Sequence, residues 1–116
     1  MKIEYLDREA VLEALALFTA ELAEMHPEIQ RILLFGSYER GIPLPSSDID
    51  LFIVLSESDR RFLDRTAFYA PDRFPVGVDI FPYTEDELET MLNEGNQFVR
   101  RALETGRLLF SRDPAP

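Results

Sequence analysis

Hydrophobic and polar positions in the first half of the chain predict one helix and two buried strands. Apolar residues recur at helical spacing over Arg8–Met25, and Asp7 is suited to cap the start of this helix. The helix should end at His26-Pro27, because the residue before a proline avoids helical dihedral angles. Residues 31–35 and 49–55 are short apolar runs, and each indicates a buried strand. The stretch between them is rich in glycine, proline and serine, which is typical of a loop.

The following residues predict a helix, a strand and a second helix. Residues 59–69 have a helical pattern, and apolar positions alternate over residues 76–81 as they do in a strand. Thr84 is a good cap for a helix over residues 85–93, and Glu87 completes a capping box with it.

The C-terminal part predicts one more helix and a short strand. The helix covers residues 97–104 and ends at Gly106, the strand covers residues 107–110, and residues 111–116 are expected to form a frayed tail. Residues 1–116 should therefore form a single α/β domain, with a small mixed β-sheet on which the helices pack.

Composition excludes several classes of protein. The chain has 46% hydrophobic and 29% charged residues, as ordinary globular proteins do, and no apolar run long enough to span a membrane. It has no cysteine, which excludes disulfides and thiolate metal sites. No secretory signal precedes the first helix, so we expect a cytoplasmic protein.

The charge balance bears on the partners of this protein. The formal net charge is −10, and a surface so negative argues against direct nucleic acid binding, which needs a basic face. A nucleotide is compatible with it, because metal ions and a few arginines can neutralise the phosphates locally. A cationic protein partner is equally compatible, and so is the simpler explanation that acidity aids solubility.

Asp48 and Asp50 are the most informative pair of residues. Residues two apart in a strand point to the same face, so both carboxylates project together. At about 4 Å and an effective dielectric constant near 20, two like charges repel by about 4 kcal/mol. A bound cation relieves this repulsion, and oxygen ligands favour magnesium, manganese or calcium. The alternative is that Asp48 caps a turn and Asp50 is solvated.

Gly36-Ser37 and Asp79 extend this pattern. A glycine at a strand end followed by serine lets backbone N–H groups approach an anion, with the hydroxyl as a further donor. The alternative is an ordinary strand end. Asp79 lies within an apolar strand; if that strand lies beside residues 49–55, three carboxylates converge on one metal centre, and otherwise Asp79 faces solvent.

These motifs together resemble the signature of the DNA polymerase beta nucleotidyltransferase superfamily. Gly36-Ser37 is followed after ten residues by Asp48-Ile49-Asp50-Leu51, and later by Val78-Asp79-Ile80. Residues 36–51 are similar in particular to the small prokaryotic minimal nucleotidyltransferases (MNT-type), many of which are antitoxins of HEPN-type toxins. The resemblance implies a polymerase-beta-like nucleotidyltransferase fold.

The resemblance also implies a role for each matched residue. Asp48 and Asp50 would hold two Mg²⁺ ions, and Asp79 would complete one metal site and help to deprotonate the attacking hydroxyl. Gly36, Ser37 and Arg40 would bind the triphosphate of the substrate, ATP. Such an arrangement suits phosphoryl transfer, which needs positioning and charge neutralisation.

One residue departs from the family pattern. Glu39 stands where many relatives carry a small residue, and it adds an acid beside the phosphate loop. We expect it to point to solvent; if it points inward it would repel the triphosphate. The sequence shows no further domain to hold an acceptor after the third carboxylate, so we expect the acceptor surface to belong to another protein.

Four functions remain open from the sequence. The first is transfer of a nucleoside monophosphate, AMP from ATP, to a hydroxyl of a partner protein, with the chain acting as antitoxin to a HEPN-type toxin. The second is a non-catalytic antitoxin that acts by occlusion. The third is a small-molecule nucleotidyltransferase acting on an aminoglycoside-like acceptor, for which an oligomer enclosing a cleft would be needed. The fourth is a cation-stabilised domain without a nucleotide.

Other polar and aromatic residues are expected to be structural. Arg60-Arg61 and Arg100-Arg101 are interpreted as solvated helix faces rather than phosphate sites. Four aromatic residues are interpreted as core rather than as a base-stacking platform: Phe62, Phe68, Tyr69 and Phe74.

Overall fold

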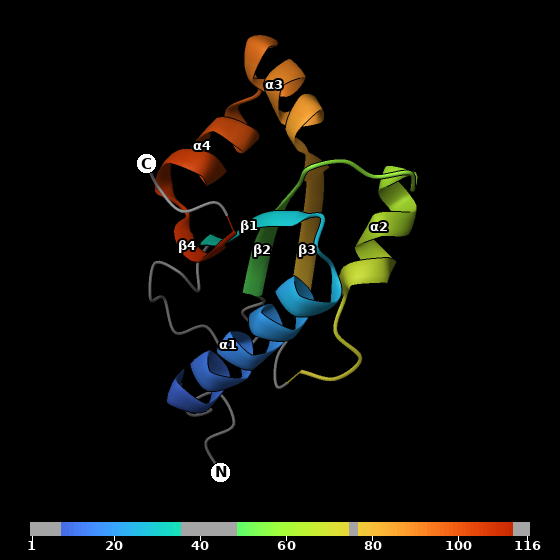
Figure 1. Cartoon of the computed structure of the whole chain (residues 1–116). Coiled ribbons are helices and arrows are strands. Elements are labelled where there is room, and N and C mark those ends of the chain that lie inside the picture. Colours follow the sequence, from blue (N-terminus) through green and yellow to red (C-terminus); the bar gives the residue numbers. More distant parts are fainter. Residues whose placement is uncertain (1–7, 36–48, 75–76, 113–116) are drawn as a thin grey trace.

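The computed structural model describes residues 8–35, 49–74 and 77–112. Along these residues the elements are α1 (Arg8–Met25), β1 (Ile29–Phe35), β2 (Ile49–Leu55), α2 (Phe62–Tyr69), β3 (Val78–Thr84), α3 (Glu85–Asn93), α4 (Gln97–Thr105) and β4 (Arg107–Ser111). Figure 1 shows α3 and α4 next to each other on one side of the strands, and α1 on the opposite side.

The four strands form one mixed sheet in the order β3-β2-β1-β4. β1 pairs with β2 and with β4 in antiparallel orientation, whereas β2 and β3 are parallel. Parallel neighbours need a crossover connection, and α2 lies in the segment that joins β2 to β3. The expected α/β fold with a small mixed sheet is confirmed.

Helices cover both faces of the sheet, and β2 contributes to both resulting cores. Ile49, Leu51 and Ile53 pack in a cluster with residues of α1 and α2, whereas Phe52 and Val54 pack in a second cluster with α3 and α4. All five side chains have no exposed surface. A strand covered on both sides needs a continuous apolar sequence, which explains the composition of β2.

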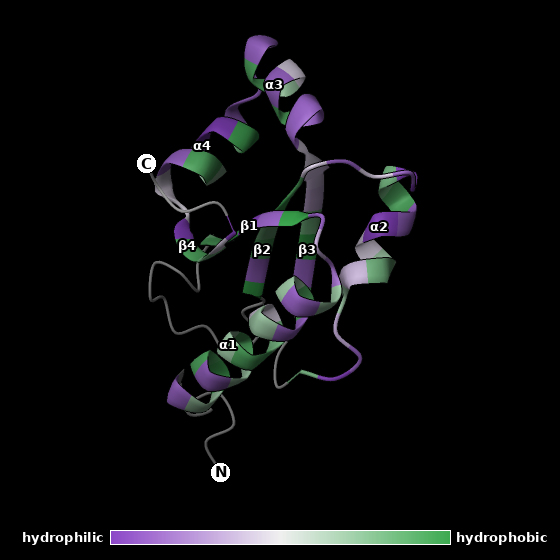
Figure 2. Ribbon diagram, in the orientation of Figure 1, coloured by the Kyte–Doolittle hydropathy of each residue, from purple (hydrophilic) through white to green (hydrophobic). Residues whose placement is uncertain are grey.

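The helices pack through one apolar side each. Figure 2 shows hydrophilic and hydrophobic residues interleaved along every helix. In α4 the buried positions are Val99 and Ala102, three residues apart and therefore on one side. α4 ends against β1: a Cβ at Gly106 would lie 3.2 Å from the Cβ of Leu33 and 2.5 Å from the carbonyl oxygen of Ala102. Glycine is needed here for this close approach.

Side-chain caps start the last two helices. In α3 the Thr84 hydroxyl accepts a hydrogen bond from the backbone N–H of Glu87, and the Glu87 carboxylate accepts one from the backbone N–H of Thr84. This capping box confirms the one expected from the sequence. In α4 the Asn96 side chain accepts from the backbone N–H of Val99.

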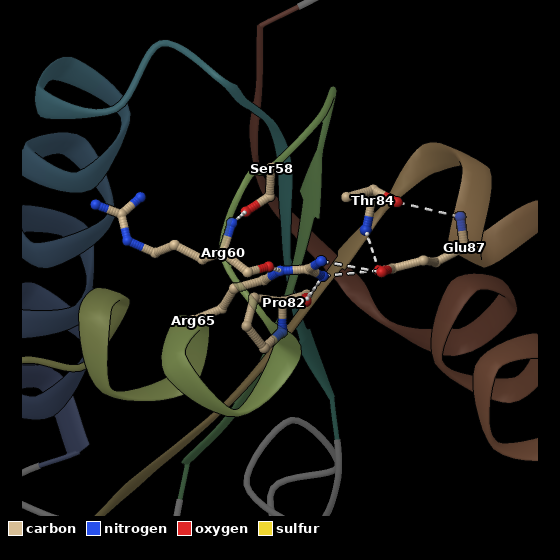
Figure 3. Close-up of polar contacts among 6 residues, drawn as sticks. All are labelled: Ser58, Arg60, Arg65, Pro82, Thr84 and Glu87. Carbon is tan, nitrogen blue, oxygen red and sulfur yellow. Dashed lines mark hydrogen bonds and ion pairs between the residues drawn. The ribbon is translucent and has the colours of Figure 1, made fainter.

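Arg65 connects α2 to β3 and α3 (Figure 3). Its side chain is only 6% exposed and donates two hydrogen bonds to the Glu87 carboxylate, at 2.7 and 3.0 Å. It also donates to the carbonyl oxygens of Arg60 and Pro82, at 3.0 and 3.2 Å. The hydrogen bond from Arg65 lowers the pKa of Glu87 below its ordinary value. A buried guanidinium is stable here because each of these donors has an acceptor.

Several element boundaries differ from the sequence expectations. β1 begins at Ile29 rather than at residue 31, and β3 continues to Thr84 rather than ending at residue 81. α2 begins at Phe62 rather than at residue 59, because the Ser58 hydroxyl accepts from the backbone N–H of Arg60 and holds a turn there. β4 includes Ser111, and Arg112 beyond it donates to the carbonyl oxygens of Ile29 and Ala23. The expectation of a frayed tail was therefore wrong for these two residues; Asp7 and residues 113–116 lie outside the described residues.

Candidate functional site

Two of the predicted acidic residues lie side by side on the sheet. Asp50 of β2 is the direct partner of Asp79 of β3 in the parallel register. Alternation along each strand puts Asp50 on the face of Phe52, and Asp79 on the face of Phe81. Both phenylalanines belong to the core under α3 and α4, so the two acids share that face of the sheet. The condition set by the sequence, that the strand of Asp79 lies beside residues 49–55, is met.

The pairing of these two acids is compatible with a shared cation. Neighbouring strands lie about 4.8 Å apart, so the side chains of directly paired residues on one face can contact the same ion. Asp79 is exposed and Asp50 is half-buried, so water can reach the pair. Carboxylate oxygens in such a position suit a hard divalent cation such as Mg²⁺.

The remaining predicted site residues, Gly36, Ser37, Arg40 and Asp48, lie outside the described residues. The elements on either side of them are described. β1 ends at Phe35, whose Cα partner is Asp50, and β2 begins at Ile49. In sequence, the glycine–serine motif directly follows the end of β1, and Asp48 directly precedes the start of β2, the strand that carries Asp50. Within the described ranges alone, no three acidic or histidine side chains form a metal-binding group.

Aromatic residues form the surface next to the two acids. On the same face, Phe35 lies beside Asp50, and the next row along the strands contains Phe52 and Phe81. Phe98 of α4 packs onto all three rings, with centroid distances of 5.3 to 6.3 Å. The acids therefore border an aromatic cluster made of Phe35, Phe52, Phe81 and Phe98.

The expectation of solvated helix faces is confirmed for Arg100-Arg101, which lie on α4, and is wrong for Arg60-Arg61, which precede the first residue of α2. Arg60 and Arg61 are exposed; the Arg60 guanidinium lies 3.4 Å from the ring centre of Phe68, and Arg61 pairs with Asp64. Arg100 and Arg101 are exposed on α4, where Arg100 pairs with Glu104 at 3.9 Å.

The four aromatic residues expected in the core divide into two groups. Tyr69 is 1% exposed and Phe74 packs against the core of α1 and α2, as expected. Burial and, secondarily, a hydrogen bond to Glu28 raise the pKa of Tyr69. Phe68 is 38% exposed, so for this residue the expectation of burial was wrong. Phe62 is half-buried, and its ring stacks on that of Tyr83 with a centroid distance of 5.0 Å. Short α2 has one buried side, and Phe68 lies at its border.

Comparison with known proteins adds the family. The profile of the family described as "Polymerase beta, Nucleotidyltransferase" matches residues 19–115, which include the Gly-Ser motif and all three aspartates. The chain belongs to this family.

Two known proteins resemble this chain. A protein of Methanocaldococcus jannaschii named "Putative protein adenylyltransferase" is 27% identical over 86 residues, covering 71% of this chain. The matched region spans 58% of that relative's length. A crystal structure described as "a putative nucleotidyltransferase from Sulfolobus solfataricus" superposes with a TM-score of 0.64, at 21% identity, covering 97% of this chain and 90% of that one. The second likeness shows a shared fold.

In this nucleotidyltransferase, the aromatic residues near the acids were not predicted from the sequence. Phe35 and Phe81 had a local signal, because Phe35 directly precedes Gly36 and Phe81 lies two residues after Asp79 on the same face. Phe98 had none, because its contacts with Phe35 and Phe81 depend on the placement of α4 over the sheet. Arg65 and Glu87 were also missed as a pair, since 22 residues separate them in sequence.

Proposed function

We propose that this protein is a nucleotidyltransferase that transfers a nucleoside monophosphate, AMP from ATP, to a hydroxyl group of a partner protein. The observation that carries the proposal is the register of Asp50 and Asp79, which brings carboxylates from two strands to one place on the sheet, next to Phe35, the residue that precedes the Gly-Ser motif in sequence. Membership of the nucleotidyltransferase family supports the reaction class. The name of the M. jannaschii relative supports a protein as acceptor and AMP as the transferred group.

The proposed roles follow the chemistry of each residue. Gly36, Ser37 and Arg40 bind the triphosphate through backbone N–H groups, a hydroxyl and a guanidinium. Asp48, Asp50 and Asp79 would hold two Mg²⁺ ions, which would neutralise the charge of the reacting phosphates. The acceptor oxygen bonds to the α-phosphorus as the bond to the bridging oxygen breaks. Pyrophosphate leaves, and Asp79 accepts the hydroxyl proton.

The partner is proposed to be a HEPN-type toxin, with this chain as its antitoxin. The proposal rests on the resemblance of residues 36–51 to MNT-type antitoxins. The net charge of −10 gives the surface an electrostatic preference for a cationic partner. A modified hydroxyl on the toxin would then carry a new negative charge and a bulky nucleoside.

Transfer can be tested with purified protein, partner, Mg²⁺ and ATP labelled at the α-phosphate. The wild type should label the partner, and Asp50→Asn and Asp79→Asn should each abolish labelling. Asp86→Asn is a matched control: Asp86 is an exposed acid at the start of α3, beyond the opposite end of β3, and its variant should label normally. Equal labelling by wild type and by the Asp50→Asn, Asp79→Asn double variant would refute catalysis.

A binding antitoxin that acts by occlusion is the second candidate. It is favoured by Glu39, an acid within the phosphate motif, and by the overall negative charge. In this case the Asp50→Asn, Asp79→Asn variant should still bind the toxin and inhibit it fully. Loss of inhibition in that variant, with binding retained, would exclude occlusion and support transfer.

A further inference from the structure

Phe98 is an exposed aromatic residue beside the acidic pair. It comes from the first turn of α4, and its side chain keeps 42% of its surface exposed. Its ring lies 5.5 Å from that of Phe35 and 5.3 Å from that of Phe81. Phe52, the fourth ring of the cluster, is completely buried beneath. One side of Phe98 is therefore held by three strands, and the remainder is open to solvent.

Burial alone does not account for phenylalanine at this position. α4 is already anchored to the sheet by Val99 and Ala102, which are 0% and 1% exposed. The Asn96 cap starts the helix independently of the ring. Solvating a large apolar surface has a free-energy cost, of about 25 cal/mol per Å² left in water. Phe98 carries that cost next to the two acids of the candidate site.

The relation of the ring to the acids matches the layout of a nucleotide. Phe35 is the register partner of Asp50, and Phe81 lies two residues beyond Asp79 on the same face. Phe98 contacts both phenylalanines, so it lies one row of side chains away from the carboxylates. A nucleoside triphosphate has charged phosphates at one end and a flat, largely apolar base at the other. The acids suit the first end, through metal ions, and an exposed ring suits the second.

We propose that Phe98 is the stacking platform for the nucleobase of the bound nucleotide. The inference rests on the proposed function, and it adds where the base lies and which residue holds it. Base stacking on an aromatic ring tolerates any base, because every base has a π-face, and purines offer the larger area. The contacts with Phe35, Phe52 and Phe81 fix the ring before the nucleotide arrives, which lowers the entropy lost on binding. Phe98 thus favours purine nucleotides and orients the α-phosphate towards the acids.

Tryptophan fluorescence gives a direct test, because the natural sequence contains no tryptophan. Phe98→Trp introduces a single indole at the platform. Mg²⁺–ATP should change its emission strongly, whereas Mg²⁺–tripolyphosphate, which has no base, should not. Phe68→Trp is a matched control, since Phe68 is 38% exposed and belongs to α2, where its ring packs against His26 on the opposite side of the sheet. Its emission should respond to neither ligand.

Calorimetry with variants that carry no tryptophan completes the test. Phe98→Ala should weaken Mg²⁺–ATP binding by roughly tenfold or more, the usual effect of removing a stacking ring. Binding of Mg²⁺–tripolyphosphate should be unchanged. Phe98→Tyr should retain the affinity for ATP, and Phe98→Leu, which keeps an apolar contact without a ring, should not. Wild-type affinity should also fall from ATP to UTP.

The outcomes separate the inference from the proposed function. If the wild type binds ATP while Phe98→Ala binds it equally well, or if tripolyphosphate changes the Phe98→Trp emission as ATP does, the platform is refuted and the proposed function stands. If the wild type binds no nucleotide, both are refuted. Thermal unfolding by circular dichroism confirms that each variant is folded. Should Phe98→Trp fail this control, the Phe98→Tyr and Phe98→Leu affinities decide the question.

Discussion

Replacing Arg65 with methionine should destabilise the fold through a small set of identifiable contacts. The variant keeps an apolar stem of similar length but removes four hydrogen bonds: two to Glu87, one to the carbonyl oxygen of Pro82 and one to that of Arg60. These contacts connect α2 to β3 and α3, so their loss loosens the packing of the crossover helix. The strand that carries Asp79 is part of the same connection.

The expected loss of stability follows from the exposure of Arg65 and of Glu87. Removing one member of a buried ion pair costs about 3–5 kcal/mol when the other charge stays buried. The Arg65 side chain is 6% exposed but the Glu87 side chain is 39% exposed, so water can solvate part of the Glu87 carboxylate once the guanidinium is removed. We therefore expect Arg65→Met to lower the free energy of unfolding by about 2–3 kcal/mol. For a chain of this size that corresponds to a decrease in Tm of roughly 8–12 °C.

A double-mutant cycle in urea measures the pairwise part. Arg65→Met, Glu87→Gln and the double variant should give a coupling free energy of about 1–2 kcal/mol. Arg61→Met is the matched control: Arg61 pairs with Asp64, the two are 85% and 53% exposed, and the loss should stay below about 0.5 kcal/mol. A loss for Arg65→Met no larger than that of the control, or a coupling near zero, would refute the account of this contact.

Three further results are expected. Arg65 holds the pKa of Glu87 below its ordinary value, so the ion pair stabilises the fold above the usual glutamate pKa of about 4.3, and this stabilisation is lost as pH falls through the lower folded-state pKa. On acidification from about pH 5 to about pH 3, the Tm of Glu87→Gln should therefore decrease less than that of the wild type. Gly106→Ala should cost about 1–3 kcal/mol in urea unfolding, because its Cβ would meet the Ala102 carbonyl at 2.5 Å; an unchanged midpoint would refute this clash. Gly95→Ala has free space but a φ of +81°, so urea unfolding should show a cost of about 1–2 kcal/mol from backbone strain alone.

Elements with strong local signals could be predicted from the sequence. β2 is apolar at every position except Asp50 and coincides with the expected strand. The Thr84–Glu87 capping box fixes the start of α3 in sequence and structure alike. The start of α2 was misplaced because the Ser58 hydroxyl holds a turn through the backbone N–H of Arg60 and Arg61 is extended, so the carbonyl oxygen of Arg61 accepts the first helical hydrogen bond, from the N–H of Arg65. Local hydrogen bonding of this kind leaves no mark in hydrophobic periodicity.

The candidate site was only partly predictable. Alternation gave the face of Asp50 and of Asp79 within each strand, but their adjacency depends on which strands pair, and that is decided by the crossover through α2. Phe98 is a tertiary contribution from α4, with no motif of its own. The assignments of Gly36, Ser37, Arg40 and Asp48 remain predictions from the sequence, because these residues lie outside the described ranges.

β3 lies at one end of the described strand order, so the candidate site can be lost by local opening while the rest of the domain stays folded. An outer strand has one neighbour instead of two, and local opening of such a segment costs less free energy than global unfolding. Asp79 would leave with β3, whereas Asp50 would stay on the central strand. Mild denaturant should therefore abolish nucleotide binding before the core of β1 and β2 loses its amide protection. In this protein, loss of activity can be the early sign of unfolding at one edge of a sheet that is otherwise intact.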